Sequence, residues 1–130
     1  MNEYYRVLNA LRRDQDLAAE VSSSSPDFYA WIGVCPLNLS RDSTIKFLKN
    51  RKVKISDPSK PIYRIRLFEA EKKLIDQDVW IGDSDLKNKQ DFFVQGDDEL
   101  FTKLADLKID PDKLSPREAL DIIYFLKSIH

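Results

Sequence analysis

The dense apolar run at residues 28–34, Phe-Tyr-Ala-Trp-Ile-Gly-Val, is the feature that most limits the folds open to this chain. Aromatic and β-branched residues in direct succession favour a strand over a short helix. An apolar run without polar alternation is typical of a strand that is buried on both faces. This run therefore predicts the central strand of a sheet, and Gly33 within it predicts a β-bulge.

Two later segments, residues 53–55 and 63–67, alternate apolar with basic side chains. The apolar members are Val53, Ile55, Tyr63, Ile65 and Leu67, and the basic members are Lys52, Lys54, Arg64 and Arg66. A period of two predicts strands with one buried face and one exposed basic face, here joined as an antiparallel pair. Residues 79–81 and 92–94 predict further strands, and residues 68–75 fit either a continued strand or a helix.

Helices are predicted at both ends of the chain and at residues 42–49. The first ends before the serine tract 22–25, and its apolar residues recur at helical spacing: Tyr4, Val7, Leu8 and Leu11. Near the other end, acidic residues after Gly96 predict a helix start. A last helix has Ser115 as its cap, Pro116 at its first position and Glu118 to complete a capping box. We expect an α+β fold: a small mixed or antiparallel sheet with an N-terminal helix and a C-terminal helical pair, with residues 1–95 forming the α+β domain and residues 96–130 a helical segment packed on it.

Composition argues against most catalytic and cofactor chemistry. The chain has 130 residues, of which 42% are hydrophobic, and this is enough for one core without cross-links. A lone cysteine, Cys35, and a lone histidine, His130, supply neither a disulfide framework nor an ordinary zinc site. Only three glycines are present, and no Gly-rich phosphate loop occurs. We expect no enzyme, metal or cofactor, and we expect a cytoplasmic protein without a signal or membrane span.

Charge is divided into a basic block at residues 46–66 and an acidic block at residues 76–99. The two blocks either face one another in the fold or serve two separate partners. On the second interpretation, the candidate nucleic-acid contacts are Lys52, Lys54, Arg64 and Arg66, with weak binding expected. The candidate acidic surface for a protein partner consists of Asp76, Asp78, Asp83, Asp85 and Asp91.

The most specific pattern lies in residues 104–129. It contains Asp-Pro-Asp at residues 110–112, Leu-Ser-Pro-Arg at 114–117 and Ala-Leu at 119–120, followed by Tyr124 and Leu-Lys-Ser at 126–128. This pattern resembles the C-terminal tail of the bacterial mismatch-repair protein MutS. The resemblance implies a small helical unit for self-association, in which Asp112 and Arg117 take part in the contact. We expect neither the mismatch-sensing nor the ATPase activity of that family, because the rest of this sequence does not resemble it.

Two classes of function are compatible with these features. The first is a non-enzymatic protein-binding module that forms a homo-oligomer through an apolar stripe, Leu120, Ile123 and Tyr124. Its acidic surface would suit an immunity or antitoxin-like inhibitor that covers a basic toxin. The alternative is a DNA-associated accessory factor that uses the basic sheet face.

Overall fold

The computed structural model describes residues 5–77 and 83–116. Its helices and strands, in chain order, are α1 (Tyr5–Arg12), β1 (Leu17–Val21), β2 (Phe28–Leu37), α2 (Asp42–Asn50), β3 (Ile62–Glu71), α3 (Lys72–Asp76), β4 (Lys87–Gln95), α4 (Gly96–Asp106) and β5 (Ser115–Pro116). Two short 3-10 helices are η1 (Asp83–Asp85) and η2 (Pro111–Lys113). Within the described ranges, none of the helices has the length and apolar character needed to cross a bilayer.

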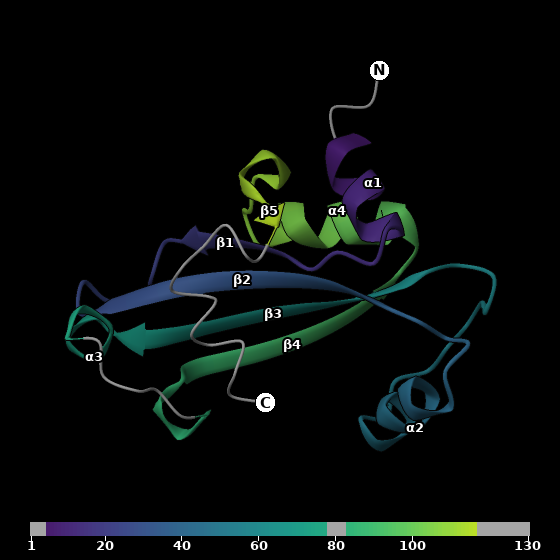
Figure 1. Ribbon diagram of the computed structural model, residues 1–130, viewed down its shortest axis with the longest axis horizontal. Helices are drawn as coiled ribbons and strands as arrows, with labels where there is room; N and C mark the ends of the chain where they lie inside the picture. The colour runs from purple at the N-terminus through teal and green to yellow at the C-terminus, as the bar shows by residue number, and fades with distance from the viewer. Residues whose placement is uncertain (1–4, 78–82, 117–130) are drawn as a thin grey trace.

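The strands form one antiparallel sheet in the order β4-β3-β2-β1-β5 (Figure 1). The predicted α+β class is therefore confirmed, and so is the central position of the run at residues 28–34. The predicted bulge at Gly33 is wrong, because Gly33 pairs in regular register with Ala18 on one side and Arg66 on the other. The register shift lies instead between Leu67 and Glu69, where β3 pairs with β4.

One face of the sheet carries the main core, which α1 and α4 cover. Inward side chains from the strands include Leu17, Ile32, Val34, Tyr63, Ile65 and Val94. They pack with Val7 and Leu11 of α1 and with Leu100 and Leu104 of α4. Leu114, just before β5, joins the same cluster. Residues from both predicted segments, 1–95 and 96–130, thus share one core.

The first helix is shorter than expected and is followed by a strand that we did not predict. The helix ends at Arg12, and Asp14 adopts a left-handed backbone conformation (φ 62°). Such a residue commonly ends a helix because it turns the chain away from the helix axis. The chain then enters β1, whose first residues Leu17, Ala18 and Ala19 are buried between β2 and β5.

The predicted strand at residues 53–55 is also wrong, because this segment is a loop. The side chain of Gln95 holds the continuation of this loop: its Oε1 accepts hydrogen bonds from the Ser56 backbone N–H and hydroxyl, and its Nε2 donates to the Asp57 carbonyl. Strand β3 is longer than predicted and pairs with β2 and β4. Residues 68–71 continue it as a strand, and α3 follows.

Helix α4 begins where the acidic residues predicted a helix start. Gly96 has a φ of 84°, and its N–H donates to the Pro61 carbonyl at 2.8 Å. Asp97, Asp98 and Glu99 then occupy the first turn, where carboxylates interact favourably with the helix dipole. Further on, Ser115 and Pro116 form β5 and pair with β1, so the predicted placement of Pro116 at the first position of a helix is wrong. The predicted helix beyond them, and the predicted strand at residues 79–81, lie outside the described residues.

Candidate functional site: the open face of the sheet

The second face of the sheet, which we call the open face, lies opposite α1 and α4. Alternation along β2 and β3 assigns to it Tyr29, Trp31, Gly33, Cys35, Arg64, Arg66 and Phe68. At one end of this face, Trp31 and Phe68 form a small second core with Leu74, Ile75 and Leu86 packed against it. At the other end lies α2 (Figure 1). The middle of the face carries charged side chains.

Three arginines share one carboxylate in the middle of the open face. The register places Arg66 opposite Asp91, and Arg64 reaches the same group diagonally. Arg64 donates from Nε and Nη2 to the two Asp91 carboxylate oxygens, both at 3.0 Å. Arg51, at the end of α2, lies 3.1 Å from the Asp91 carboxylate, and Arg66 Nε lies 3.5 Å from it. The cluster therefore carries an excess of positive charge.

The surroundings of Asp91 favour its ionised form. Burial raises the pKa of this carboxyl group, but the hydrogen bond and charge of Arg64, with the charges of Arg66 and Arg51, hold the pKa below its ordinary value. The side chains of Arg64, Arg66 and Asp91 are each less than a quarter exposed. A two-point arginine–carboxylate pair with so little water around it fixes the orientation of both groups.

Aromatic rings of α2 and β4 fix Arg64 from its other side. The Phe47 and Phe93 rings pack edge to face with centroids 6.0 Å apart. The guanidinium carbon of Arg64 lies 5.1 Å from the Phe47 centroid and 5.9 Å from that of Phe93. Arg51 also lies 5.1 Å from the Phe47 centroid. These cation–π contacts attach α2 to the sheet, and they give Arg64 a structural role.

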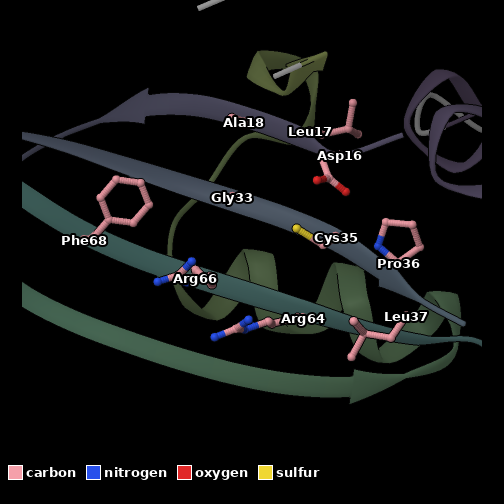
Figure 2. Close-up of a pocket in the computed structure, with 10 residues that line it drawn as sticks. All are labelled: Asp16, Leu17, Ala18, Gly33, Cys35, Pro36, Leu37, Arg64, Arg66 and Phe68. Atoms are coloured by element: carbon pink, nitrogen blue, oxygen red, sulfur yellow. The ribbon is translucent and has the colours of Figure 1, made fainter. Parts of the chain in front are cut away.

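A hollow of about 300 Å³ lies beside the arginines, over β1, β2 and β3. Its lining residues are Asp16, Leu17, Ala18, Gly33, Cys35, Pro36, Leu37, Arg64, Arg66 and Phe68. Figure 2 shows Arg64 and Arg66 side by side on β3, and Gly33 between Ala18 and Arg66. The hollow is thus apolar over β1 and β2 and cationic over β3, with Asp16 as its acidic group.

Gly33 lines this hollow, and the backbone does not require a glycine there. A Cβ atom added at this position would have the Leu17 carbonyl oxygen, at 4.0 Å, as its nearest neighbour among the described residues. Register is regular on both sides of the strand. A glycine inside a strand weakens it and often marks a place where a ligand or another chain segment approaches closely.

The basic residues predicted to share one sheet face are divided. Arg64 and Arg66 lie on the open face, where they contact Asp91. Lys52 follows α2 with a φ of 59°, and Lys54 lies in the loop after it. The continuous basic strand face that was the basis of the nucleic-acid hypothesis is therefore absent from the described residues.

The acidic candidates are also divided. Asp91 faces the arginines, so at this position the acidic and basic blocks of the sequence meet. Asp76 lies at the end of α3 and accepts a hydrogen bond from the Tyr29 hydroxyl at 2.8 Å. Asp83 and Asp85 belong to η1, whereas Asp78 lies outside the described residues.

Of the residues predicted for self-association, Asp112 alone is described. It lies in η2, is exposed, and its backbone carbonyl accepts a hydrogen bond from Arg6 at 3.1 Å. Arg117, Leu120, Ile123 and Tyr124 lie outside the described residues. The residues that sequence reasoning missed are Arg51 and Gly33. The only sequence signal for Gly33 was an interruption in a β-branched run, which we interpreted as a bulge.

Within residues 5–77 and 83–116, no group of three or more histidine, cysteine, aspartate or glutamate side chains is arranged to hold a metal ion.

Glu69 is nearly buried at 7% exposure, and its carboxylate accepts hydrogen bonds from the Ser24 backbone N–H, the Ser24 hydroxyl and the Asn88 amide. Burial raises the pKa of Glu69, but these hydrogen bonds lower it overall. This carboxylate therefore anchors the serine tract to the sheet.

Comparison with known proteins gives one match. Residues 96–129 match the family model described as "DNA mismatch repair protein MutS C-terminal region". The match confirms the resemblance and extends it back to the start of α4, whereas residues 1–95 lie outside it. No curated protein and no solved structure matches the chain significantly.

Proposed function

We propose that this chain is a non-enzymatic protein-binding module that self-associates through the last part of its MutS-like segment. The observation that carries the proposal is the family match over residues 96–129. The resemblance implies that this segment serves contact between subunits. No catalytic constellation competes with this interpretation in the sequence.

The packing of the matching segment favours its last part as the contact surface. Leu100, Leu104 and Leu114 are fully buried in the core of their own domain. Apolar surface that is already buried is not available to a second subunit. Residues after Pro116 are the remaining part of the match, and the exposed Asp112 precedes them by a few positions.

Apolar contact should dominate the energy of such an interface. Burial of Leu120, Ile123 and Tyr124 against a second copy would remove several hundred Å² per subunit, and this burial contributes roughly 25 cal/mol per Å². A partly exposed pair of Asp112 and Arg117 would add about 1 kcal/mol or less. In a twofold assembly each such contact occurs twice, so the ion pair would set the register.

The test is the mass of the full chain in solution, measured by light scattering over a concentration series. Ile123→Glu should dissociate the assembly, because it places a charge within the apolar contact. Arg117→Glu should weaken the assembly, and adding Asp112→Arg should partly restore it. Circular dichroism checks that each variant is folded. A wild-type protein that is monomeric at high micromolar concentration would overturn the proposal.

We do not extend the proposal to an inhibitor of a basic toxin or to a DNA-associated factor. The first would use an acidic surface that includes Asp91, and the second a basic face that includes Arg64 and Arg66. Arg64 lies 3.0 Å and Arg66 lies 3.5 Å from the Asp91 carboxylate. Mutual pairing lowers the charge that each offers to an outside partner.

A further inference from the structure

The hollow of the open face is apolar over β1 and β2, and it is lined by Gly33, although the backbone does not require a glycine at that position. The two ends of the face are filled, by Trp31 and Phe68 with their neighbours and by Phe47 of α2. Between them, Gly33 leaves space over the central strand, and Cys35 and Leu37 border it. Gly33 itself is only half-buried, and a glycine inside a strand often marks a place where a ligand or another chain segment approaches closely.

The described chain reaches the border of this hollow at its last residues. Pro116 pairs with Leu17, and Ser115 pairs with Ala18, and both partners line the hollow. Strands lie about 4.8 Å apart, so Gly33 on β2 is about two strand spacings from β5. A helix of 13 residues is about 20 Å long. Residues 117–129 can therefore cover the hollow of their own subunit without a long linker.

The sequence of residues 117–129 offers two apolar arcs at helical spacing. The first contains the residues of the proposed subunit contact, Leu120, Ile123 and Tyr124, near Arg117. The second contains Ile122, Phe125, Leu126 and Ile129. An amphipathic helix on a protein surface needs only one apolar arc, and a helix with two packs against two partners. The proposed function uses the first arc and leaves the second without a partner.

We infer that the hollow over Gly33 is the docking site of residues 117–129 of the same chain, which pack their second arc against it. This inference rests on the proposed function, because docking of the second arc is what presents the first arc to another subunit. The same subunit is the favoured source, since a segment tethered at the border of the hollow has a local concentration in the millimolar range.

Cys35 provides a reporter, because it lines the hollow and is the only cysteine of the chain. New cysteines are introduced one at a time in the full-length protein, at Ile122, Leu126 and Ile129 in the second arc. Matched controls are Asp121→Cys and Ser128→Cys, which at helical spacing lie about 100° away from the centre of the second arc. Mild oxidation followed by mass spectrometry and non-reducing electrophoresis measures disulfide formation with Cys35.

Docking predicts an intramolecular disulfide for at least one second-arc position, formed about tenfold faster than for either control, since disulfides require Cβ atoms about 4 Å apart. Adding Gly33→Leu, which fills the hollow, should abolish the difference, whereas Gly33→Ala should reduce it less. Equal rates at all five positions would overturn the inference. An intermolecular disulfide would also overturn it, because a second copy would then occupy the hollow.

Two neighbouring substitutions separate this inference from the proposed function. Ile123→Glu should give a monomer that still forms the intramolecular disulfide. Ile122→Glu should abolish that disulfide. A wild-type protein that is monomeric yet forms the disulfide would refute self-association alone. An oligomer in which no second-arc cysteine reacts preferentially would refute the docking site alone.

Discussion

Asp91→Asn should lower the free energy of unfolding by about 2–3 kcal/mol, although it changes only one atom type in the side chain. Arg64 makes two charge-assisted hydrogen bonds to Asp91, both at 3.0 Å. Hydrogen bonds to charged groups contribute about 1.5–3 kcal/mol where water is mostly excluded. Arg51 is 46% exposed, so its pair with Asp91 adds less than about 1 kcal/mol. Asparagine keeps one acceptor oxygen but removes the negative charge that Arg64, Arg66 and Arg51 share at this position.

Urea unfolding followed by far-ultraviolet circular dichroism measures this loss. Small proteins have urea slopes of about 1–3 kcal/mol per molar, so the midpoint should fall by about 1–2 M. Glu71→Gln is the matched control, because its pair with Lys73 spans 3.5 Å and the lysine side chain is 72% exposed. That change should cost less than about 0.5 kcal/mol. Equal midpoints for the two variants would refute the assignment of Asp91 as the centre of the arginine cluster.

The same pair predicts how stability depends on pH. The pKa of Asp91 is lowered in the folded protein, so its carboxylate stabilises the fold at every pH above the unfolded value of about 3.9. This contribution is lost as the pH falls through the folded value. The difference in stability between wild type and Asp91→Asn should thus be full at pH 7 and decline below about pH 4. A difference that stays constant into stronger acid would contradict this.

Two further predictions concern the matching segment and the divided basic residues. Leu104→Ala should lower the free energy of unfolding in urea by about 2–5 kcal/mol, because Leu104 is fully buried. Leu107→Ala, at a half-buried position, should lower it clearly less. Equal losses for the two variants would contradict the burial of α4. Binding to a labelled DNA duplex, measured by fluorescence anisotropy, should be weak and should decline as salt is raised from about 50 to 200 mM, and Lys52→Glu should weaken it further. Nanomolar binding at physiological salt would show that the pairing of Arg64 and Arg66 with Asp91 does not suppress nucleic-acid contact.

The hydrophobic patterns of the sequence correctly predicted those strands whose residue preferences agree with their position in the sheet. The apolar run at 28–34 has neighbours on both sides in β2, and the alternation at 63–67 lies within β3. Strand β1 was missed because Leu-Ala-Ala-Glu-Val has little intrinsic strand preference. Its conformation depends on pairing with β2 and β5. These are long-range contacts, which the residue preferences of a short segment cannot predict. The alternation at 53–55 predicted a strand, but a distant side chain, Gln95, binds the loop that follows it.

The sequence predicted which side chains of one strand share a face, but it did not predict which side chains of neighbouring strands lie beside them. Alternation correctly placed Arg64 and Arg66 on one face of a strand. It could not place Asp91 beside them, because the register between β3 and β4 depends on the conformation of the connection between them. We therefore assigned Asp91 to an acidic surface of its own. The possibility that the acidic and basic blocks face one another was stated from the sequence, and at Asp91 the fold realises it.

The described part of the MutS-like segment belongs to the core of the domain, and this decides how the proposed self-association must be tested. Its first part supplies Leu100, Leu104 and Leu114, which are fully buried beneath the sheet together with α1. A chain that stops at Gln95 would lose these side chains and open the core, so loss of self-association there would report unfolding. A chain that stops at Pro116 keeps α4 and the pairing of β5 with β1. Of the two truncations, only the second tests the proposed subunit contact separately from the stability of the domain.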